Sequence, residues 1–343
     1  MMPSRREKIL ALQFKYFGDA VLMTPALRAL RESYPEADIQ LLVPAEIAPL
    51  FEHLPWLTRV WAMSRHRGRA NLRETLPLIR ALRRERFDRS VDFAGNDRGA
   101  ILSFLVGARR RLGWAEGGGF FGRRFLYTDR VAPKEGVMHE SSRLAQLLAG
   151  WGVPLPRSLE AEIRADPALG EAAAKILPDR RTIVCHVASS QPKKEWPMAH
   201  WAELHRLASS AGRRMAFTTA KGERERSLMA GLKALAPDAE VLPLIGELPL
   251  FLAVLGRAAM FVSGDTGPLH FAAGLGVPTV AMFGPTRAVQ WAPIGERHRS
   301  LTGGVCTCDG NSPDCHSARH CLAEITPERV FAALERGKTP VPV

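Results

Sequence analysis

The sequence of 343 residues lacks several features that define common classes of protein. It has no run of 18 or more uncharged apolar residues, which a membrane-spanning helix would need. It has no internal repeat and no low-complexity segment. The first apolar segment is broken by Gln13 and Lys15, so we interpret it as a strand and not as a signal peptide. These absences predict a globular, cytoplasmic protein.

The sequence also lacks the marks of two classes of binding protein. No Gly-x-Gly-x-x-Gly follows the first predicted strand, which counts against a dinucleotide-dependent oxidoreductase. The basic residues are scattered along the chain and are not gathered on one element with aromatic residues between them, so we expect no nucleic acid partner. The formal net charge is nevertheless +12. This excess favours an anionic membrane surface or an anionic substrate.

Apolar strand patterns alternate with helical patterns in both halves of the chain. Such alternation predicts βαβ units and parallel sheets. The pattern fades in a proline-rich segment at 154–167, where we place a linker. The fold class is therefore α/β, with doubly wound domains at 1–160 and 161–325 and a tail helix in 326–343. The expected strands are 9–14, 39–43, 59–62, 87–92, 182–187, 215–219, 240–242, 260–263 and 279–283.

The most informative segment spans residues 261–286. An apolar strand ends at Ser263, a tight turn follows at 264–267, and Pro268 stands where a helix would begin. A strand, a glycine-rich loop and a helix start together present free backbone N–H groups to an anion. We interpret this segment as a place to hold a diphosphate, although the turn residues alone are more often explained by helix capping.

The whole segment resembles the signature of the ADP-heptose:lipopolysaccharide heptosyltransferases, glycosyltransferase family 9. In that signature Asp-Thr/Ser-Gly-x-x-His leads into an Ala-rich helix and a Phe/Tyr-Gly-Pro-Thr turn, as Asp265 to His270 and residues 283–286 do here. The resemblance implies a GT-B architecture of two Rossmann-like domains facing a central cleft. It also implies an inverting glycosyltransferase that moves heptose from ADP-heptose to the lipopolysaccharide inner core (a lipid A–Kdo or heptosyl acceptor) without a required cofactor.

Asp19 is the residue that the resemblance implies as the catalytic base. It follows Gly18 after the first predicted strand, and Thr-Pro-Ala-Leu follows at the family's spacing. Inverting transfer needs one carboxylate to take the proton from the attacking hydroxyl of the acceptor. Without the resemblance, an aspartate here would be better explained as a helix cap.

Four arginines of the first domain are candidates for binding the acceptor. Arg65, Arg67 and Arg69 lie in a run that is typical of a loop, and Arg98 follows a predicted strand end. Each alone is more readily explained as a solvated surface residue, and Arg98 is the best candidate because strand ends face the cleft. Guanidinium groups would match phosphorylated or carboxylated inner-core sugars.

The second domain is expected to bind the donor. Ser189 and Ser190 follow a predicted strand and can donate hydrogen bonds to phosphate oxygens. A Lys-x-Trp-Pro motif begins at Lys194, which aligns with the family's phosphate-contacting lysine, and Lys193 is its competitor.

The same resemblance implies roles for residues further along the chain. Glu223 aligns with the acid that accepts hydrogen bonds from the ribose hydroxyls, with Glu225 as the alternative, although either would also suit a helix N-terminus. Ile245 would border the nucleobase. In the signature, the backbone of Thr266 and Gly267 would contact the diphosphate, Asp265 would hold donor hydroxyls or orient the loop, and His270 would contact phosphate or sugar.

Four cysteines lie close together near the end of the sequence: Cys306, Cys308, Cys315 and Cys321. Such a cluster can hold a structural zinc or iron ion, but Cys-x-Cys is a poor spacing for a zinc knuckle. We expect no metal in catalysis.

The expected partners are the nucleotide-sugar donor, an anionic glycolipid acceptor and the inner face of the cytoplasmic membrane, where the protein would bind peripherally. Three alternatives stay open: a family 9 enzyme acting on a protein or small molecule, a non-catalytic binding protein organised by the cysteines, and a sugar epimerase.

Overall fold

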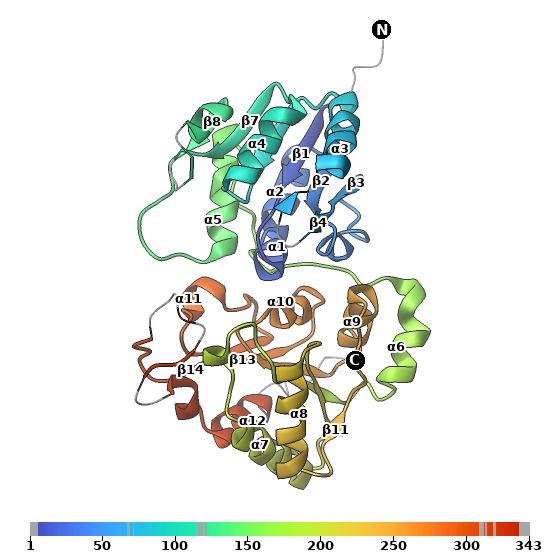
Figure 1. Ribbon diagram of the computed structural model, residues 1–343, viewed down its shortest axis with the longest axis vertical. Coiled ribbons are helices and arrows are strands. Elements are labelled where there is room, and N and C mark those ends of the chain that lie inside the picture. The colour runs from blue at the N-terminus through green and yellow to red at the C-terminus, as the bar shows by residue number, and fades with distance from the viewer. Residues whose placement is uncertain are drawn as a thin grey trace. The chain divides into compact units, whose positions relative to one another are not determined.

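The computed structural model describes residues 6–335 except 67, 68, 71, 116–118, 121, 309–311, 313, 318 and 319. The chain divides into two compact units, Met1–Arg164 and Ala165–Val343 (Figure 1). Each unit is built around its own parallel sheet. Within the described residues, no helix has the length and apolar character needed to cross a bilayer.

Unit 1 contains a six-stranded parallel sheet in the order β3-β2-β1-β6-β7-β8. Its strands are β1 Lys8–Leu12, β2 Asp38–Pro44, β3 Arg59–Met63, β6 Arg89–Asp92, β7 Arg110–Trp114 and β8 Asp129–Val131. A small hairpin joins β4 Arg65–His66 to β5 Arg69–Ala70. The helices are α1 Phe17–Leu22, α2 Thr24–Ser33, α3 Leu72–Glu85, α4 Asp97–Val106 and α5 Glu140–Leu147, with 3-10 turns η1 Ala48–Leu50, η2 Arg123–Leu126 and η3 Leu148–Trp151.

Unit 2 repeats this plan with the order β11-β10-β9-β12-β13-β14. Its strands are β9 Ile183–His186, β10 Met215–Thr218, β11 Glu240–Val241, β12 Met260–Gly264, β13 Thr279–Phe283 and β14 His298–Thr302. The helices are α6 Gly170–Ile176, α7 Met198–Ser210, α8 Glu223–Leu235, α9 Leu248–Leu255, α10 Gly267–Gly274, α11 Ala288–Trp291 and α12 Pro327–Glu335, with 3-10 turns η4 Pro167–Leu169, η5 Pro192–Lys194 and η6 Cys321–Glu324.

The central strands are apolar because both faces of each sheet are covered. Ile9 and Leu10 are neighbours on β1 and point to opposite faces, and both are fully buried. On one face, Leu10 packs with Leu82 of α3 and Leu102 of α4. In unit 2, Val262 of β12 packs with Trp201 of α7 in a similar core. The predicted strands are all present, and β7, β8 and β14 were not predicted. Strands β4 and β5 were not predicted either, since we expected a loop around Arg65 and Arg69.

In unit 1, β2 and β3 are added on one side of β1, and β6, β7 and β8 are added on the other side. In unit 2, the same change of side occurs between β9 and β12. In open α/β sheets, ligands bind at the carboxyl ends of the strands beside such a switch point. The sheet topology alone therefore marks one candidate edge in each unit.

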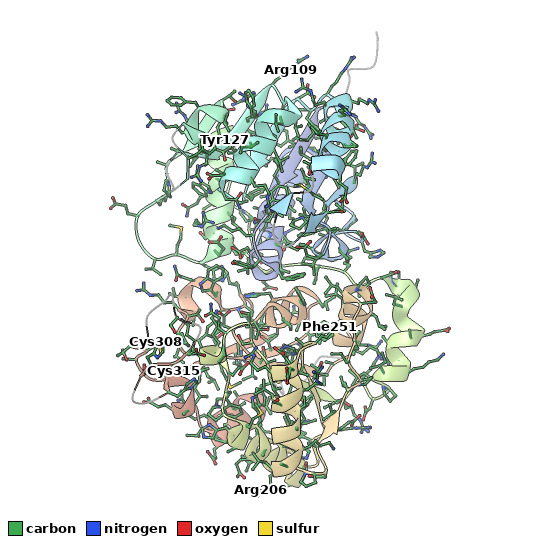
Figure 2. All side chains as sticks on the ribbon, in the orientation of Figure 1. Arg109, Tyr127, Arg206, Phe251, Cys308 and Cys315 are labelled. Carbon is green, nitrogen blue, oxygen red and sulfur yellow. The ribbon has the colours of Figure 1, made fainter. Side chains whose placement is uncertain are left out.

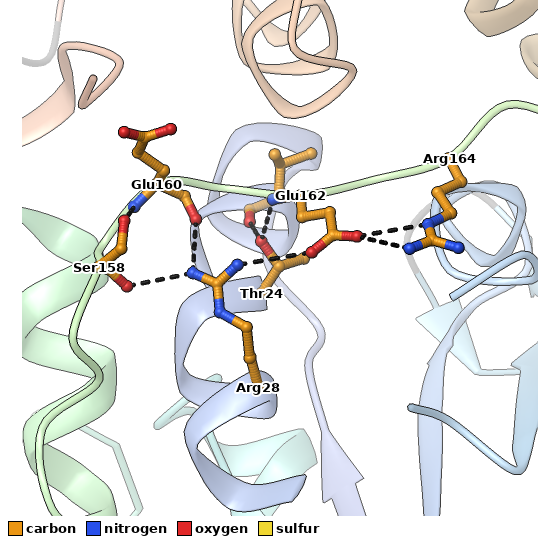
Figure 3. A network of polar contacts seen from close by, with 7 residues as sticks. Thr24, Arg28, Ser158, Glu160, Glu162 and Arg164 are labelled. Atoms are coloured by element: carbon orange, nitrogen blue, oxygen red, sulfur yellow. Dashed lines mark hydrogen bonds and ion pairs between the residues drawn. The ribbon is translucent and has the colours of Figure 1, made fainter. Parts of the chain in front are cut away.

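The segment that ends unit 1 is fixed to α2 (Figure 3). The Thr24 hydroxyl accepts a hydrogen bond from the backbone N–H of Glu162 at 2.9 Å. Arg28 donates to the carbonyl oxygens of Ser158 and Glu160, both at 3.1 Å. Thr24 is the first residue of α2, and its hydroxyl donates to the Val21 carbonyl oxygen at 2.7 Å.

Candidate active site

In unit 1, Asp19 lies just beyond the carboxyl end of β1, at the switch point. It is on α1 and only 7% exposed. The Nζ atom of Lys15 lies 3.7 Å from Asp19 Oδ1 and 3.7 Å from Glu140 Oε1, at the start of α5. A carboxylate and an ammonium group thus lie together at the edge where the topology places a site.

Glu140 and Arg143 extend this charged group. The Arg143 guanidinium donates two hydrogen bonds to the Glu140 carboxylate, at 2.7 and 2.5 Å, and lies 5.1 Å from the ring centre of Trp114. Burial would raise the pKa of Glu140, but the bonds from Arg143 and the charge of Lys15 more than offset it, so this pKa is lowered. Glu140 therefore stays ionised and holds Lys15 beside Asp19. The sequence analysis missed these residues because only tertiary packing brings them together.

Of the four arginines predicted to bind the acceptor, Arg98 is the one whose side chain the structure describes. It lies in the first turn of α4, after β6, and β6 pairs directly with β1. Arg98 and Asp19 therefore follow neighbouring strands at one edge of the sheet. Arg67 lies outside the described residues, and Arg65 and Arg69 are described only as backbone of β4 and β5.

The loop that leads to Arg98 is anchored by Asp92, a fully buried carboxyl group at the end of β6. Asp92 accepts hydrogen bonds from the Tyr127 hydroxyl at 2.6 Å and from the backbone N–H of Ala94 at 3.0 Å. A Cβ atom on Gly99 would overlap this carboxylate, so glycine is required at the start of α4. Burial raises the pKa of Asp92 to about 6, against the hydrogen bonds from Tyr127 and the loop, which lower it.

This raised pKa predicts a dependence of stability on pH. Between pH 3.8, the ordinary pKa of the group, and about 6, the folded protein keeps a proton on Asp92 that the unfolded chain has lost. The contribution of Asp92 to the free energy of unfolding therefore falls as pH rises, by about 3 kcal/mol in total. Urea denaturation of an Asp92→Asn variant should show that its free energy of unfolding no longer has this fall with rising pH. An asparagine can still accept from Ala94 and donate to Tyr127.

Asp129→Asn is the matched control for this measurement. The Asp129 pKa is lowered, because its hydrogen bonds from Arg110 and Thr128 outweigh the effect of burial. Its contribution to stability is therefore lost as pH falls, which is the opposite sign. An Asp92→Asn variant with the pH profile of the unsubstituted protein would show that Asp92 is ionised over this whole range.

In unit 2, three charged or polar side chains meet at the end of β12. Lys194 Nζ lies 2.8 Å from Asp265 Oδ2, and His270 Nε2 lies 3.8 Å from Asp265 Oδ1. Burial would raise the pKa of Asp265, but His270 and the charge of Lys194 outweigh it and hold this pKa well below its usual range. A Cβ atom on Gly264 would lie 2.8 Å from the Lys194 carbonyl oxygen, so glycine allows the two loops to approach.

The predicted anion-binding loop has the form expected of it. Thr266 is the N-cap of α10 in extended conformation, and Pro268 lies in the first turn. The Thr266 side chain makes no capping hydrogen bond, and its buried hydroxyl is among the described side-chain atoms that have no hydrogen-bond partner. The Nδ1 atom of His270 also belongs to this set of described buried atoms without a hydrogen-bond partner, and His270 is only 4% exposed. Unpartnered buried polar atoms next to a helix N-terminus are suited to an anionic ligand.

The loop after β9 is held against α8 by Arg224, which the sequence analysis did not single out. Arg224 forms ion pairs with Glu195 and, at 2.9 Å, with Glu225, and donates to the Ser189 carbonyl oxygen. The backbone N–H of Ser189 donates to Glu195 Oε1 at 3.1 Å. Ser189 is buried and Ser190 is exposed. These contacts fix the backbone of the predicted phosphate-binding loop.

The two glutamates considered for the ribose differ in their surroundings. Glu223 is exposed at the first position of α8. Glu225 is half-buried and paired with Arg224, and its charge acts on His186, whose pKa burial lowers to about 4. Ile245 lies half-buried in the loop between β11 and α9. The contacts of these residues with a nucleotide stay predictions.

The four cysteines are linked by contacts: Cys308 contacts Cys306 and Cys315, and Cys306 contacts Cys321. Cys308 and Cys315 are labelled in Figure 2. The Sγ atoms of Cys308 and Cys315 are 3.4 Å apart, and hydrogen bonding with Ser317 and Cys315 lowers the pKa of Cys308 to about 6. Burial, followed by the neighbouring Cys306, raises the pKa of Cys321 to about 12. Within the part of the chain that the structure describes, no three His, Cys, Asp or Glu side chains are gathered closely enough to hold a metal ion. The side chains as placed do not fit a metal site.

Two Rossmann-like units, each built on a six-stranded parallel sheet, are the architecture of the GT-B class of nucleotide-sugar transferases. The sequence model of glycosyltransferase family 9 (heptosyltransferase) matches residues 75–312. The chain therefore belongs to this family and is a glycosyltransferase, as the resemblance implied.

Known proteins similar to this chain agree with that assignment. It is 28% identical over 344 residues to lipopolysaccharide heptosyltransferase 2 of Escherichia coli K12, with 95% of this chain and 97% of that protein covered. Its fold is similar to that of E. coli ADP-heptose lipopolysaccharide heptosyltransferase II (TM-score 0.76, 22% identity, 96% and 98% covered). It is also similar to an E. coli heptosyltransferase bound to ADP-2-deoxy-2-fluoro heptose (TM-score 0.74, 21% identity, 96% and 99% covered).

Proposed function

We propose that this protein transfers heptose from ADP-heptose to an acceptor of the lipopolysaccharide inner core. The observation that carries this proposal is the match to a lipopolysaccharide heptosyltransferase over 95% of this chain and 97% of the relative. Such a match includes both units, and so both the predicted donor residues and the predicted acceptor residues.

Asp19 acts as the general base. The acceptor hydroxyl oxygen attacks the anomeric carbon of the heptose, Asp19 takes the hydroxyl proton, and the bond from that carbon to the diphosphate oxygen breaks. The attack comes from the side opposite the leaving group, so the configuration inverts and ADP leaves. The Lys15 ammonium lies 3.7 Å from the Asp19 carboxylate. Glu140 and Arg143 position that lysine.

Unit 2 binds the ADP portion. Lys194 and the backbone N–H groups of Thr266 and Gly267 contact the diphosphate and stabilise the charge that develops as it leaves. Asp265 keeps Lys194 oriented, and His270 donates to phosphate or sugar. Ser189 and Ser190 contribute further donors. Glu223 accepts hydrogen bonds from the ribose, and Ile245 lines the nucleobase.

The acceptor is an anionic glycolipid, bound through Arg98 and through Arg65, Arg67 and Arg69. Since this substrate has a lipid anchor, the protein works at the inner face of the cytoplasmic membrane as a peripheral protein. The net charge of +12 supports this location. No step of the reaction depends on a metal ion at the cysteines.

Calorimetric titration with ADP, UDP and GDP tests the donor half of the proposal. We expect selective binding of ADP, weakened in Glu223→Ala because the ribose loses its acceptor. Glu225→Ala is the comparison, because this residue pairs with Arg224 and acts on the loop. Preference for UDP or GDP would contradict ADP-heptose as the donor, and a larger loss in Glu225→Ala would reassign the ribose contact.

A further inference from the structure

One surface of unit 1 carries exposed apolar side chains that lie outside the proposed active site. Ile101 and Phe104 are three residues apart on α4, so they share a face, and they are 42% and 50% exposed. Phe120 and Phe125 lie in the neighbouring segment around η2 and are 43% and 63% exposed. We name these four residues the apolar face.

The two segments that form the apolar face are held together. The backbone N–H of Phe120 donates to Asp97 Oδ1 at 3.3 Å, which ties it to the first turn of α4. Arg123, only 7% exposed, pairs with the same carboxylate at 3.4 Å. Helix α4 and η2 are also in contact with each other. The apolar face is therefore one fixed surface.

Arginines surround this face. The guanidinium of Arg111 lies 5.6 Å from the ring centre of Phe104, and that of Arg124 lies 5.0 Å from the ring of Phe125. Between residues 97 and 126 the sequence has six arginines against two acidic residues, Asp97 and Glu116. One of these acids, Asp97, is already paired with Arg123. Arg110 is likewise paired, with Asp129 at 2.7 Å. The face thus combines apolar side chains with an excess of positive charge, of which Arg111 and Arg124 lie beside its aromatic rings.

A basic hollow lies one turn beyond Phe104. The helix ends at Gly107, and a cavity of about 270 Å³ is lined there by Arg83, Arg86, Phe87, Val106, Gly107 and Arg109 (Arg109 is labelled in Figure 2). Arg83 reaches this end of α4 by donating to the Leu105 carbonyl oxygen at 3.0 Å. The positive charge therefore continues past the end of the apolar face.

We propose that the apolar face and its arginines are the surface by which this protein docks on an anionic lipid bilayer. Aromatic and aliphatic side chains enter the boundary between headgroups and acyl chains, and arginines beside them bind headgroup phosphates. A two-fold dimer through this surface is disfavoured, since it would bring the arginines of both copies face to face. The inference rests on the proposed function in one respect, that the lipid acceptor lies in such a bilayer.

Cosedimentation with lipid vesicles tests this surface. The full chain should bind vesicles that mix phosphatidylcholine with phosphatidylglycerol and bind pure phosphatidylcholine weakly. In the double variant Phe104→Gln with Phe125→Gln, partitioning onto the mixed vesicles should fall by about tenfold or more. Arg124→Gln should weaken binding to the mixed vesicles and leave the weak binding to pure phosphatidylcholine unchanged. Added salt should also weaken binding to the mixed vesicles.

A matched control is a double variant of exposed leucines in unit 2, Leu235→Gln with Leu244→Gln, each 56% exposed. It should bind vesicles as the unsubstituted protein does. The proposal is overturned if the phenylalanine variant partitions like this control, or if that variant instead converts a dimer to a monomer in light scattering. Vesicle binding needs neither donor nor acceptor. A protein that binds ADP but not the mixed vesicles would therefore contradict the proposed docking surface and leave the proposed function standing.

Discussion

Replacement of Asp19 with asparagine should lower kcat for heptose transfer by about 10²–10⁴-fold, the usual contribution of a positioned general base. The amide keeps the size of the side chain but cannot accept the proton of the attacking hydroxyl. The residue is on α1 of unit 1, whereas the predicted nucleotide contacts all lie in unit 2. The dissociation constant of ADP, measured by calorimetry, should therefore change little.

Glu32→Gln is the control for the loss of a carboxylate from the same unit. Glu32 is exposed on α2, and its variant should keep the turnover of the unsubstituted enzyme. An Asp19→Asn enzyme with ordinary kcat would remove Asp19 from the role of base. A large loss of ADP affinity in that variant would place Asp19 in donor binding instead.

Replacement of Lys194 with glutamine should weaken the binding of ADP by about 10- to 100-fold. A hydrogen bond to a charged group contributes about 1.5–3 kcal/mol, and each 1.4 kcal/mol corresponds to a factor of ten. Lys194 has the one ammonium group that the structure places on Asp265, at 2.8 Å and beside the N-terminus of α10. A rise in the KM for ADP-heptose should accompany the loss.

Two further measurements separate binding from folding in this experiment. Lys233→Gln removes an exposed ammonium from the far end of α8 and should bind ADP normally. Urea denaturation of Lys194→Gln should show a lowered but cooperative transition, because Asp265 loses its main cation. Unchanged ADP affinity in a folded Lys194→Gln protein would show that Lys194 serves only to pair with Asp265.

Most of the strands that the sequence predicted are central ones, with the apolar pattern that two covered faces require. The edge strands β3 and β11 were predicted as well. Strand β7 was missed because it begins with two arginines and contains Gly113, against which the ring of Tyr127 packs. Strand β8 has three residues, two of them charged, and lies at the edge of its sheet. Strand β14 is an edge strand of the sheet in unit 2, and Leu301 is its one apolar residue. Edge strands carry little of the pattern on which such predictions rest.

The residues of the candidate site also divide into those that the sequence predicted and those that it did not. Asp19, Lys194 and the loop at Asp265 were predicted because they follow strand ends in motifs of fixed spacing. Lys15 was visible as an interruption of the first apolar segment, yet its contact with Glu140 joins residues far apart in sequence. Arg224 likewise reaches back to Glu195 across two loops. No spacing rule in a single sequence reports such pairs, which tertiary packing creates.

The central claim is tested most directly by incubating the purified protein with ADP-heptose and, in separate reactions, a lipid A–Kdo acceptor or its heptosylated form. The acceptor is followed by mass spectrometry. The account predicts an acceptor heavier by one heptose, one ADP released per transfer, and no product with UDP- or GDP-linked sugars or with Asp19→Asn in the same time. An unchanged acceptor of either lipid A–Kdo or heptosylated form, with ADP-heptose bound and intact, would contradict the proposed transfer.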